Sequence, residues 1–443
     1  MIVVETNSRR RVVVTGLGVV TPVGLGMDET WKALLEGQSG VDFIKSFDAG
    51  AFPTRFGAEV KGFDGRKYVD KPKALKLMGK NIQFGLGAAK MAVDDSRLDL
   101  TKEDPARVGV IMGAGIVNSN LFELATAIHH SLDATGKFDL GRFATEGKDQ
   151  LFPLSLLKHL PNMIAGHISI VYNCQGTSNT ITTACASATQ AIGEALRNIS
   201  RGDADVILSG GSDSRLEPLG LTGYCLLGAL SQRNDDPRRA SRPFDKERDG
   251  FVIGEGSGVV VMESLEHALA RGARIRAEVL GYGCSADAYR VTDLHPDGRG
   301  GMQAMRAALA DARLEPSQID VISGHGTSTP QNDRVETLAI KQVFGADAYR
   351  VPVSALKSML GHLGAASGAV QFAATVKMLE EDVIPPTINY EVPDPECDLD
   401  YVPNEPRRLP LSTALSNSFG FGGQNAVLVL REWSGPDSAG GSA

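Results

Sequence analysis

One cysteine of the chain lies where a β-rich apolar run meets a helix-like run, a place suited to a nucleophile. Cys185 stands in the segment Ile181–Thr189. Its sulfur is predicted at a helix N-terminus, where unpaired N–H groups and the positive end of the helix dipole favour the thiolate that attacks thioesters. A lone cysteine in an apolar run is more often a small buried residue. The nucleophile interpretation therefore needs partners elsewhere in the chain.

Three glycine-rich segments of the second half supply such partners: Gly324–Asp333 with His325, Lys357–Gly368 with Lys357 and His362, and Asn417–Asn425. Of the eight histidines, only these two follow predicted strands among Gly, Ser and Thr. Each alone would be an ordinary hydrogen-bonded loop residue. Two strand-end imidazoles, a lysine in an apolar setting and a helix-tip cysteine together predict a catalytic site.

The elements that must position these residues alternate between short β-branched runs and helix-period segments, a pattern typical of parallel βαβ units. After Cys185 we expect a helix whose buried face carries Ala188, Ile192, Ala195, Leu196 and Ile199, and which ends at Gly202. The expected strands are Arg11–Val20, Val108–Gly113, Thr180–Ala184, Asp205–Gly210, Gly258–Glu263, Ile275–Gly281, Asp320–Gly324, Val351–Ala355 and Ala426–Arg431.

The first five and the last four of these strands follow one design. Val108–Gly115 parallels Asp320–Gly326, and Ile181–Ser187 parallels Val353–Ser358, each followed by a small-residue-rich helix. This pattern predicts an α/β fold built from two duplicated halves, 10–265 and 266–433. No linker separates them, so we expect the halves to pack as one body. The tails 1–9 and 434–443 are expected to be loose.

The composition describes an enzyme-sized globular chain of 443 residues, 42% of them hydrophobic, with a net charge of −8. The negative charge argues against nucleic acid as a partner. Five widely spaced cysteines contain no CxxC pair, so we expect no disulfide framework and no metal site. With no export signal or membrane-spanning run, the cytoplasm is the expected compartment.

Taken in order, these motifs resemble the β-ketoacyl-acyl carrier protein synthases of the elongating type II kind, which belong to the thiolase-fold condensing enzymes. The resemblance covers about residues 10–432 and includes Arg11–Gly24, Thr183–Cys185, Ser241–Gly256 and the three glycine-rich segments. It implies a five-layer αβαβα fold and a homodimer, or a heterodimer with a related subunit. It also implies acyl carrier protein as partner and no cofactor beyond the carrier's phosphopantetheine.

The resemblance further implies a role for each residue of the site. Cys185 would carry the acyl group, and His325 and His362 would stabilise the enolate formed when malonyl loses CO2. Lys357 would form an ion pair with Glu336, with Asp333 as a second acidic neighbour. The remaining implied roles are backbone oxyanion donors at Cys185 and Phe421, a gate at Phe421 and Phe419, and pantetheine contacts at Thr327 and Thr329.

Two implied surfaces depart from, or extend, the family pattern. At the acyl-pocket wall the chain has Gly115–Leu121, including Ile116, which is bulkier and more polar than the glycine-rich loop usual in fatty-acid elongators. Lys73, Lys76 and Lys80, with Lys71 adjacent, have the spacing of one cationic helix face, on which an acidic carrier could dock. A solvated face is the common meaning of such spacing.

The alternatives differ in what they require of the chain. Residues 331–337 and 395–403 also resemble ketosynthase subunits of type II polyketide and polyene pathways, so such a subunit remains an alternative to fatty acid elongation. A non-catalytic chain-length-factor-like subunit would lack Cys185. A thiolase would need a second cysteine within 417–425, where none occurs, and the starter-type synthase would have asparagine in place of one histidine.

Overall fold

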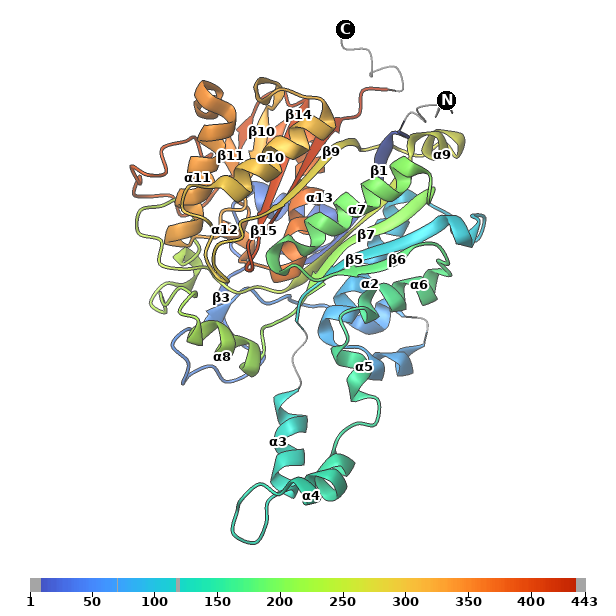
Figure 1. Cartoon of the computed structure of the whole chain (residues 1–443), viewed down its shortest axis with the longest axis vertical. Helices are drawn as coiled ribbons and strands as arrows, with labels where there is room; N and C mark the ends of the chain where they lie inside the picture. The colour runs from blue at the N-terminus through green and yellow to red at the C-terminus, as the bar shows by residue number, and fades with distance from the viewer. Residues whose placement is uncertain (1–8, 70, 117–119, 436–443) are drawn as a thin grey trace.

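A mixed sheet of eleven strands forms the centre of the computed structural model, which describes residues 9–69, 71–116 and 120–435 (Figure 1). The strand order is β11-β10-β14-β15-β9-β1-β8-β7-β5-β6, with β2 attached to β1. The strands are β1 Val12–Thr21, β2 Gly24–Leu25, β5 Val108–Ala114, β6 Ser178–Ile181, β7 Val206–Asp213, β8 Gly256–Ser264, β9 Ala277–Ala286, β10 Val321–Ser323, β11 Val353–Ser354, β14 Thr413–Phe419 and β15 Gln424–Glu432.

The two halves of this sheet repeat one topology, which confirms the predicted duplication. In the first half β5 pairs in parallel with β6 and β7, and β8 pairs antiparallel with β7 and β1. In the second half β10 pairs in parallel with β11 and β14, and β15 pairs antiparallel with β14 and β9. A short antiparallel pairing of β1 with β9 joins the halves.

The helices form three layers around the two half-sheets. Helices α7 (Ser187–Arg201) and α13 (Ser367–Glu381) lie in the middle and contact strands of both halves. Helices α2 (Lys80–Ser96) and α6 (Met163–Tyr172) pack on the outer face of the first half, and α10 (Arg299–Ala312) packs on the outer face of the second, with α11 (Pro330–Phe344) beside it. The arrangement is the expected five-layer αβαβα fold (Figure 1).

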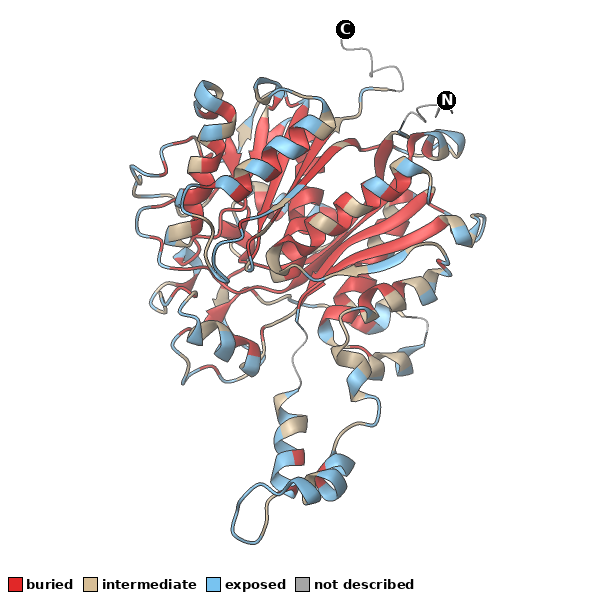
Figure 2. Cartoon of the chain, in the orientation of Figure 1, coloured by how far each residue is buried: buried red, intermediate tan, exposed pale blue. Residues whose placement is uncertain are grey.

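Burial follows these layers, because each sheet face must cover its apolar side chains against helices. The largest apolar core lies between the halves and includes Leu17, Ile192, Val260 and Phe372. Two further cores lie under the outer helices, one around Phe84 and one around Ile340. All ten residues of β1 are buried, which gives its near-continuous apolar sequence a physical reason (Figure 2).

The helix predicted after Cys185 is confirmed. The five residues expected on its buried face are all buried in α7, and Gly202 ends the helix in the left-handed conformation at φ 85°. Glycine takes this conformation without the steric cost that a Cβ would bring.

Two features of the second half differ from the sequence-based prediction. Strand β14 was missed, because the Asn417–Asn425 segment was interpreted as a turn feeding the last strand, whereas Asn417–Phe419 is the buried end of β14. The predicted similarity of Ile181–Ser187 and Val353–Ser358 holds for their strands, β6 and β11, but is wrong for the turns that follow. Helix α13 follows the turn η10 (Gly364–Ala366), as α7 follows η6 (Ala184–Ala186). The turn that carries Lys357 and His362 therefore has no counterpart in the first half.

An arm of short elements projects from the first half (Figure 1). It runs from α3 (Leu121–His130) to α5 (Ser155–His159), and its exposed apolar side chains include Phe122, Phe138, Leu140 and Leu156. Between them lie α4 (Leu140–Arg142), the π-helical turn η4 (Phe143–Gly147) and η5 (Lys148–Gln150).

The remaining short elements are α1 Met27–Leu35, α8 Pro218–Leu226, α9 Leu265–Ala270, α12 Lys357–Leu360, η1 Gly65–Tyr68, η2 Pro72–Leu77, η3 Pro105–Arg107, η7 Pro237–Arg239, η8 Pro316–Gln318, η9 Gly345–Tyr349 and the pairs β3 Asp42–Phe43 with β4 Phe56–Gly57 and β12 Val383–Ile384 with β13 Arg407–Arg408. Among the described residues, no helix has the length and apolarity needed to span a membrane. Nearly all of the two predicted loose tails, residues 1–8 and 436–443, falls outside the described residues.

Candidate active site

Cys185 lies in a sharp turn between β6 and α7. Ala184, directly before it, has a positive φ of 49°, an uncommon conformation for a residue with a Cβ. The turn directs the sulfur into a cavity of about 510 Å³, whose lining also includes His325, His362 and Phe421. The sulfur and the ring nitrogens of the two histidines lie within 4.8 Å of one another. The fold therefore brings together three residues that are far apart in the sequence.

His362 has a defined proton arrangement. The Gly364 N–H donates to its Nδ1 at 3.1 Å, and the Ser367 hydroxyl lies 3.0 Å from the same atom. Because Nδ1 accepts a hydrogen bond from a backbone N–H, the proton of the neutral ring must be on Nε2. Nε2 lies 3.0 Å from the Cys185 sulfur and donates toward it. His362 is thus a hydrogen-bond donor to the reacting atoms.

His325 is held in the same tautomer by Lys357. The Lys357 Nζ lies 3.3 Å from Nδ1 of His325 and also donates to the His325 carbonyl oxygen. Nε2 of His325 therefore carries the proton. The two rings are nearly perpendicular, with centroids 5.6 Å apart. Gln371 supports the lysine, with Oε1 at 3.4 Å, while its amide donates to the Ser323 carbonyl.

Burial sets the charges of the site. Burial, followed by the charge of Lys357, lowers the pKa of both imidazoles well below the ordinary value, so they are neutral donors at physiological pH. Burial also lowers the pKa of Lys357 to about 8. The N–H group of a neutral imidazole can stabilise an oxyanion by a hydrogen bond without transferring its proton.

The pKa of the Cys185 thiol is raised, which contradicts the prediction of a thiol pKa lowered by the helix N-terminus. Burial is the dominant cause, because it disfavours the charged form. Arg215, Lys357 and the Phe421 backbone N–H act in the opposite direction. The hydrogen bond to the sulfur also places the Phe421 N–H where the predicted oxyanion donor was expected.

Glu336 and Asp333 lie under the loop that carries His325. Glu336 accepts hydrogen bonds from the backbone N–H groups of His325 at 2.7 Å and Gly326 at 2.8 Å, and from Asn417 at 3.1 Å. Among the described residues, no carboxylate lies at ion-pair distance from Lys357, so the predicted ion pair with Glu336 is wrong as a contact. Although burial lowers the pKa of Lys357, the charge of Glu336 acts to raise it. Glu336 instead fixes the backbone of the histidine loop.

Asp333 serves the next part of the same loop. Its carboxylate accepts from the backbone N–H groups of Thr327 at 3.0 Å and Ser328 at 3.1 Å, and from Phe244 at 2.8 Å. Thr327 and Thr329 line the cavity with their hydroxyls 2.9 Å apart. Phe419 and Phe421 also line it. Both threonines and both phenylalanines therefore belong to the cavity wall, while the pantetheine contacts and the gate stay predictions.

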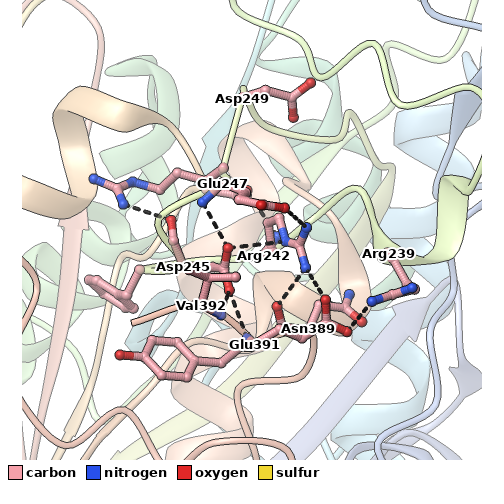
Figure 3. Close-up of polar contacts among 12 residues, drawn as sticks. Arg239, Arg242, Asp245, Glu247, Asp249, Asn389, Glu391 and Val392 are labelled. Atoms are coloured by element: carbon pink, nitrogen blue, oxygen red, sulfur yellow. Dashed lines mark hydrogen bonds and ion pairs between the residues drawn. The ribbon is translucent and has the colours of Figure 1, made fainter. Parts of the chain in front are cut away.

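The segment Ser241–Gly250 connects the parts of the site through buried charge (Figure 3). Arg242 is 1% exposed and binds the Glu391 carboxylate at 2.7 Å and Asp245 at 3.5 Å. Asp245 in turn accepts from the N–H groups of Glu391 and Val392, both at 2.7 Å.

The same segment reaches the catalytic loops directly. The Ser241 hydroxyl donates to the Lys357 carbonyl at 2.7 Å, and Arg248 donates to the carbonyls of Thr329 and Pro330. Rigid supports of this kind hold reacting groups in register.

Sequence reasoning missed several polar residues of the cavity, among them Asp213, Arg215 and Tyr224, which contact one another. The Arg215 Nε lies 3.2 Å from Asp213, and its Nη1 donates to the Tyr224 hydroxyl. A charged pair at the end of a buried strand, β7, was a usable signal. Ligand sites in α/β sheets gather at the carboxyl ends of strands.

The predicted docking lysines and the predicted pocket wall do not lie as the sequence led us to expect. Lys73 and Lys76 lie on the 3-10 helix η2, whereas Lys80 begins α2 after two non-helical residues, so the single helix face is wrong. Lys80 is moreover paired with the buried Glu255 at 2.6 Å. Ile116 is 63% exposed and does not contribute to the cavity lining, while residues 117–119 of the predicted wall lie outside the described residues.

Comparisons with known proteins agree with this geometry. Residues 9–268 match the family model "Beta-ketoacyl synthase, N-terminal domain", and residues 276–391 match "Beta-ketoacyl synthase, C-terminal domain". The chain is 44% identical over 425 residues to 3-oxoacyl-[acyl-carrier-protein] synthase 2 of Synechocystis sp., covering 96% of this chain and 99% of that protein. The relative of the same name from Staphylococcus aureus (strain COL) is 40% identical, with coverage of 96% and 99%.

Solved structures give the same result. The structure of a type II PKS acyl-carrier protein in complex with its ketosynthase bound to the hexaketide matches with a TM-score of 0.83 and 37% identity, covering 96% of this chain and 100% of that chain. The ishigamide ketosynthase/chain length factor matches with a TM-score of 0.85 and 36% identity at the same coverage. The chain therefore belongs to the β-ketoacyl synthase family.

Proposed function

We propose that the chain is a 3-oxoacyl-[acyl-carrier-protein] synthase, which condenses an acyl group on Cys185 with malonyl-acyl carrier protein in fatty acid chain elongation. The observation that carries this proposal is the convergence of the Cys185 sulfur and the imidazole nitrogens of His325 and His362 within 4.8 Å. A nucleophile beside two neutral N–H donors suits a reaction that forms first a thioester and then an enolate.

In the first half-reaction, the Cys185 thiolate attacks the carbonyl carbon of an acyl thioester on the carrier's phosphopantetheine. The electron pair moves to the carbonyl oxygen, where the N–H groups of Cys185 and Phe421 stabilise it. The tetrahedral intermediate then collapses, the bond to the pantetheine sulfur breaks, and the carrier leaves as a thiolate, which takes up from solvent a proton equivalent to the one that Cys185 released on forming its thiolate. The acyl group remains on Cys185.

In the second half-reaction, malonyl enters on another carrier, and the Nε2–H groups of His325 and His362 donate to its thioester oxygen. The bond to the carboxylate breaks, CO2 leaves, and its electron pair forms the enolate that these donors stabilise. The enolate carbon attacks the acyl carbonyl and expels the Cys185 thiolate. The product is 3-oxoacyl-acyl carrier protein.

The residues around the cavity supply the supporting roles. Lys357 keeps His325 in the donor tautomer, and Glu336 and Asp333 hold the loop that carries His325 and Thr327. Thr327 and Thr329 are placed to bind the pantetheine amides. We propose that the reaction needs no cofactor beyond this substrate-borne arm.

Acyl carrier protein is the macromolecular partner of the proposed reaction, and we further propose that the enzyme is a dimer. Strand β6 is the edge of the large sheet, and its first two residues are exposed. Ile170 and Val171 near it are exposed, as are the apolar residues of the arm. Among the described strands β6 pairs only with β5, and a free sheet edge beside exposed apolar side chains favours pairing with a second subunit. Five free cysteines fit a cytoplasmic location.

The test is incubation with malonyl- and acyl-carrier protein, followed by measurement of CO2 and of the 3-oxoacyl product by mass spectrometry. The wild-type protein should give both products, and Cys185→Ala should give no acyl-enzyme and no condensation product. If the wild-type protein forms neither an acyl-enzyme nor CO2, the proposal fails.

A ketosynthase subunit of a polyketide or polyene pathway is the second candidate. It is favoured by the likeness to the two solved ketosynthases at 36 and 37% identity and by the polar side chains of Asp213, Arg215 and Tyr224 in the cavity. A non-catalytic chain-length-factor-like role has less support, because the nucleophile and both donors are in place.

A further inference from the structure

The catalytic cavity contains a buried ion pair that has no contact with substrate in the proposed condensation, although Arg215 acts against burial to lower the pKa of Cys185. Asp213 ends β7 and Arg215 follows two residues later, and both line the cavity together with Cys185. Their side chains are only 4% and 15% exposed. A buried charge pair is costly to maintain, because both groups lose their hydration. Because the ion pair lines the same cavity as the nucleophile, a bound substrate can contact it.

Two of the three guanidinium nitrogens of Arg215 donate hydrogen bonds to neighbouring side chains. Its Nε donates to Asp213 at 3.2 Å and its Nη1 donates to the Tyr224 hydroxyl. A guanidinium has five N–H groups, two of them on Nη2. No described residue accepts a hydrogen bond from Nη2. Asp213 is fixed independently, because its carboxylate also accepts from the Ala365 N–H at 2.9 Å, in the turn that follows His362.

Nη2 of Arg215 lies beside Gly115, which precedes the undescribed residues 117–119. A Cβ placed on Gly115 would lie 2.4 Å from Nη2 and 2.3 Å from a carboxylate oxygen of Asp213, so a glycine is needed there to leave room for the pair. Gly115 begins the segment in which the acyl-pocket wall was predicted. Thr327 and Thr329, the proposed pantetheine contacts, belong instead to the loop before α11.

We propose that Arg215 is a specificity-determining residue, whose Nη2 donates a hydrogen bond to a keto oxygen of the acyl chain on Cys185. The proposal rests on the proposed condensing activity and names its substrate class: acyl groups that retain a carbonyl oxygen along the chain. It keeps the proposed condensing reaction but departs from the fatty acid pathway named first above, because it favours the second candidate, the polyketide type.

The chemistry of the pair explains this choice over other acyl groups. A saturated chain would bury the Nη2 N–H groups without an acceptor, and an unsatisfied buried donor is costly. A chain ending in a carboxylate would bring a second negative charge beside Asp213, which already neutralises Arg215. A neutral keto oxygen satisfies the donor and adds no charge.

The test compares pantetheine thioesters of equal length: hexanoyl, 3-oxohexanoyl and 5-oxohexanoyl. The rate of Cys185 acylation is followed by intact mass over a range of thioester concentrations. We expect the better keto substrate to exceed hexanoyl in kcat/KM by roughly tenfold, the scale of one hydrogen bond to a charged group. If hexanoyl equals or exceeds both keto substrates with the wild-type protein, the proposal is overturned.

Two variants test whether Arg215 causes the preference. Arg215→Lys keeps the positive charge beside Asp213 but removes Nη2, and Tyr224→Phe keeps the ring but removes the hydroxyl that holds Nη1. The keto-to-hexanoyl ratio of kcat/KM should fall toward one in Arg215→Lys and fall less in Tyr224→Phe. The matched control Arg290→Lys changes an exposed arginine paired with Asp293, and its ratio should equal that of the wild-type protein.

The outcomes separate this proposal from the proposed function. An unchanged ratio in both Arg215→Lys and Tyr224→Phe overturns the role of Arg215, whatever their absolute rates. If no thioester acylates Cys185 in the wild-type protein, the condensing function itself fails. If hexanoyl acylates well and the keto substrates do not, the condensing function stands and the substrate inference falls.

Discussion

The Nε2 of His362 lies 3.0 Å from the Cys185 sulfur, while the Gly364 N–H donates a hydrogen bond to the other ring nitrogen, Nδ1. His362 therefore gives a hydrogen bond to the sulfur and has no free lone pair with which to take its proton. The histidine is placed to stabilise negative charge, first on the sulfur and then on an oxygen. This distinguishes the site from nucleophile–base pairs, in which the histidine accepts the proton of the nucleophile.

Replacing His362 should damage condensation more than acylation. His362→Ala removes one of two donors to the enolate oxygen, and loss of one oxyanion donor lowers kcat by roughly 100- to 1000-fold. CO2 release from malonyl-carrier protein measures the enolate step, and intact mass after addition of acyl-carrier protein alone measures acylation. Equal losses in both half-reactions would contradict the assignment of His362 as an enolate donor.

The pH dependence of enolate formation should report the charge of Lys357. Its pKa is lowered to about 8, so the lysine is charged below that pH and becomes neutral as the pH rises through it. CO2 release should therefore decline above pH 8, because His325 loses its cationic partner. The measurement is made in Cys185→Ala, which removes the titrating thiol. Lys357→Met should release CO2 slowly and without this decline; the same decline in the variant would assign it to another group.

Alkylation of Cys185 should respond to pH as a thiol with a raised pKa does. Its pKa is raised above the ordinary 9.0, so the thiolate fraction grows throughout the neutral range. The rate of modification by iodoacetamide, followed at the peptide containing residue 185, should still be rising at pH 9. A plateau near neutral pH would show instead that the helix N-terminus lowers the thiol pKa by more than burial raises it.

The buried Arg242 should matter far more to stability than its exposed neighbour Arg239, although both bind Glu391 (Figure 3). Arg242→Met leaves Asp245 uncompensated in the interior and should lower the free energy of unfolding by roughly 3–5 kcal/mol. Arg239 is 52% exposed, and Arg239→Met should cost about 1 kcal/mol or less. Urea unfolding followed by circular dichroism compares the two variants, and similar losses would contradict the argument.

The lysines near the start of α2 give a test of carrier docking. Lys73→Glu with Lys76→Glu reverses two exposed charges and should raise the KM for acyl-carrier protein severalfold, because carrier proteins of this kind are acidic. Thiol labelling of Cys185 should stay unchanged. Lys102→Glu is the matched control, since this lysine is 79% exposed and pairs with Asp99. An unchanged KM in the double variant would show that these lysines are not part of the docking surface.

The sequence by itself determined the local elements of the fold. The apolar face from Ala188 to Ile199 and the glycine at 202 are enough to specify α7, because helix periodicity and a left-handed end are local properties. The two repeated sets of strands were readable for the same reason. Strand β14 was not, since its small polar residues, such as Ser416 and Asn417, carry no apolar alternation and are buried only by their neighbours.

Only the tertiary structure decided what these residues do to one another. The tautomers of His325 and His362 depend on Lys357 and on the Gly364 N–H, and the raised pKa of Cys185 depends on burial that no local pattern encodes. Glu336 was expected to pair with Lys357 and instead binds backbone N–H groups. Arg215 escaped notice because Tyr224 reaches it from helix α8 and Cys185 from the turn after β6, and the effect of a charge depends on distance and solvent exposure.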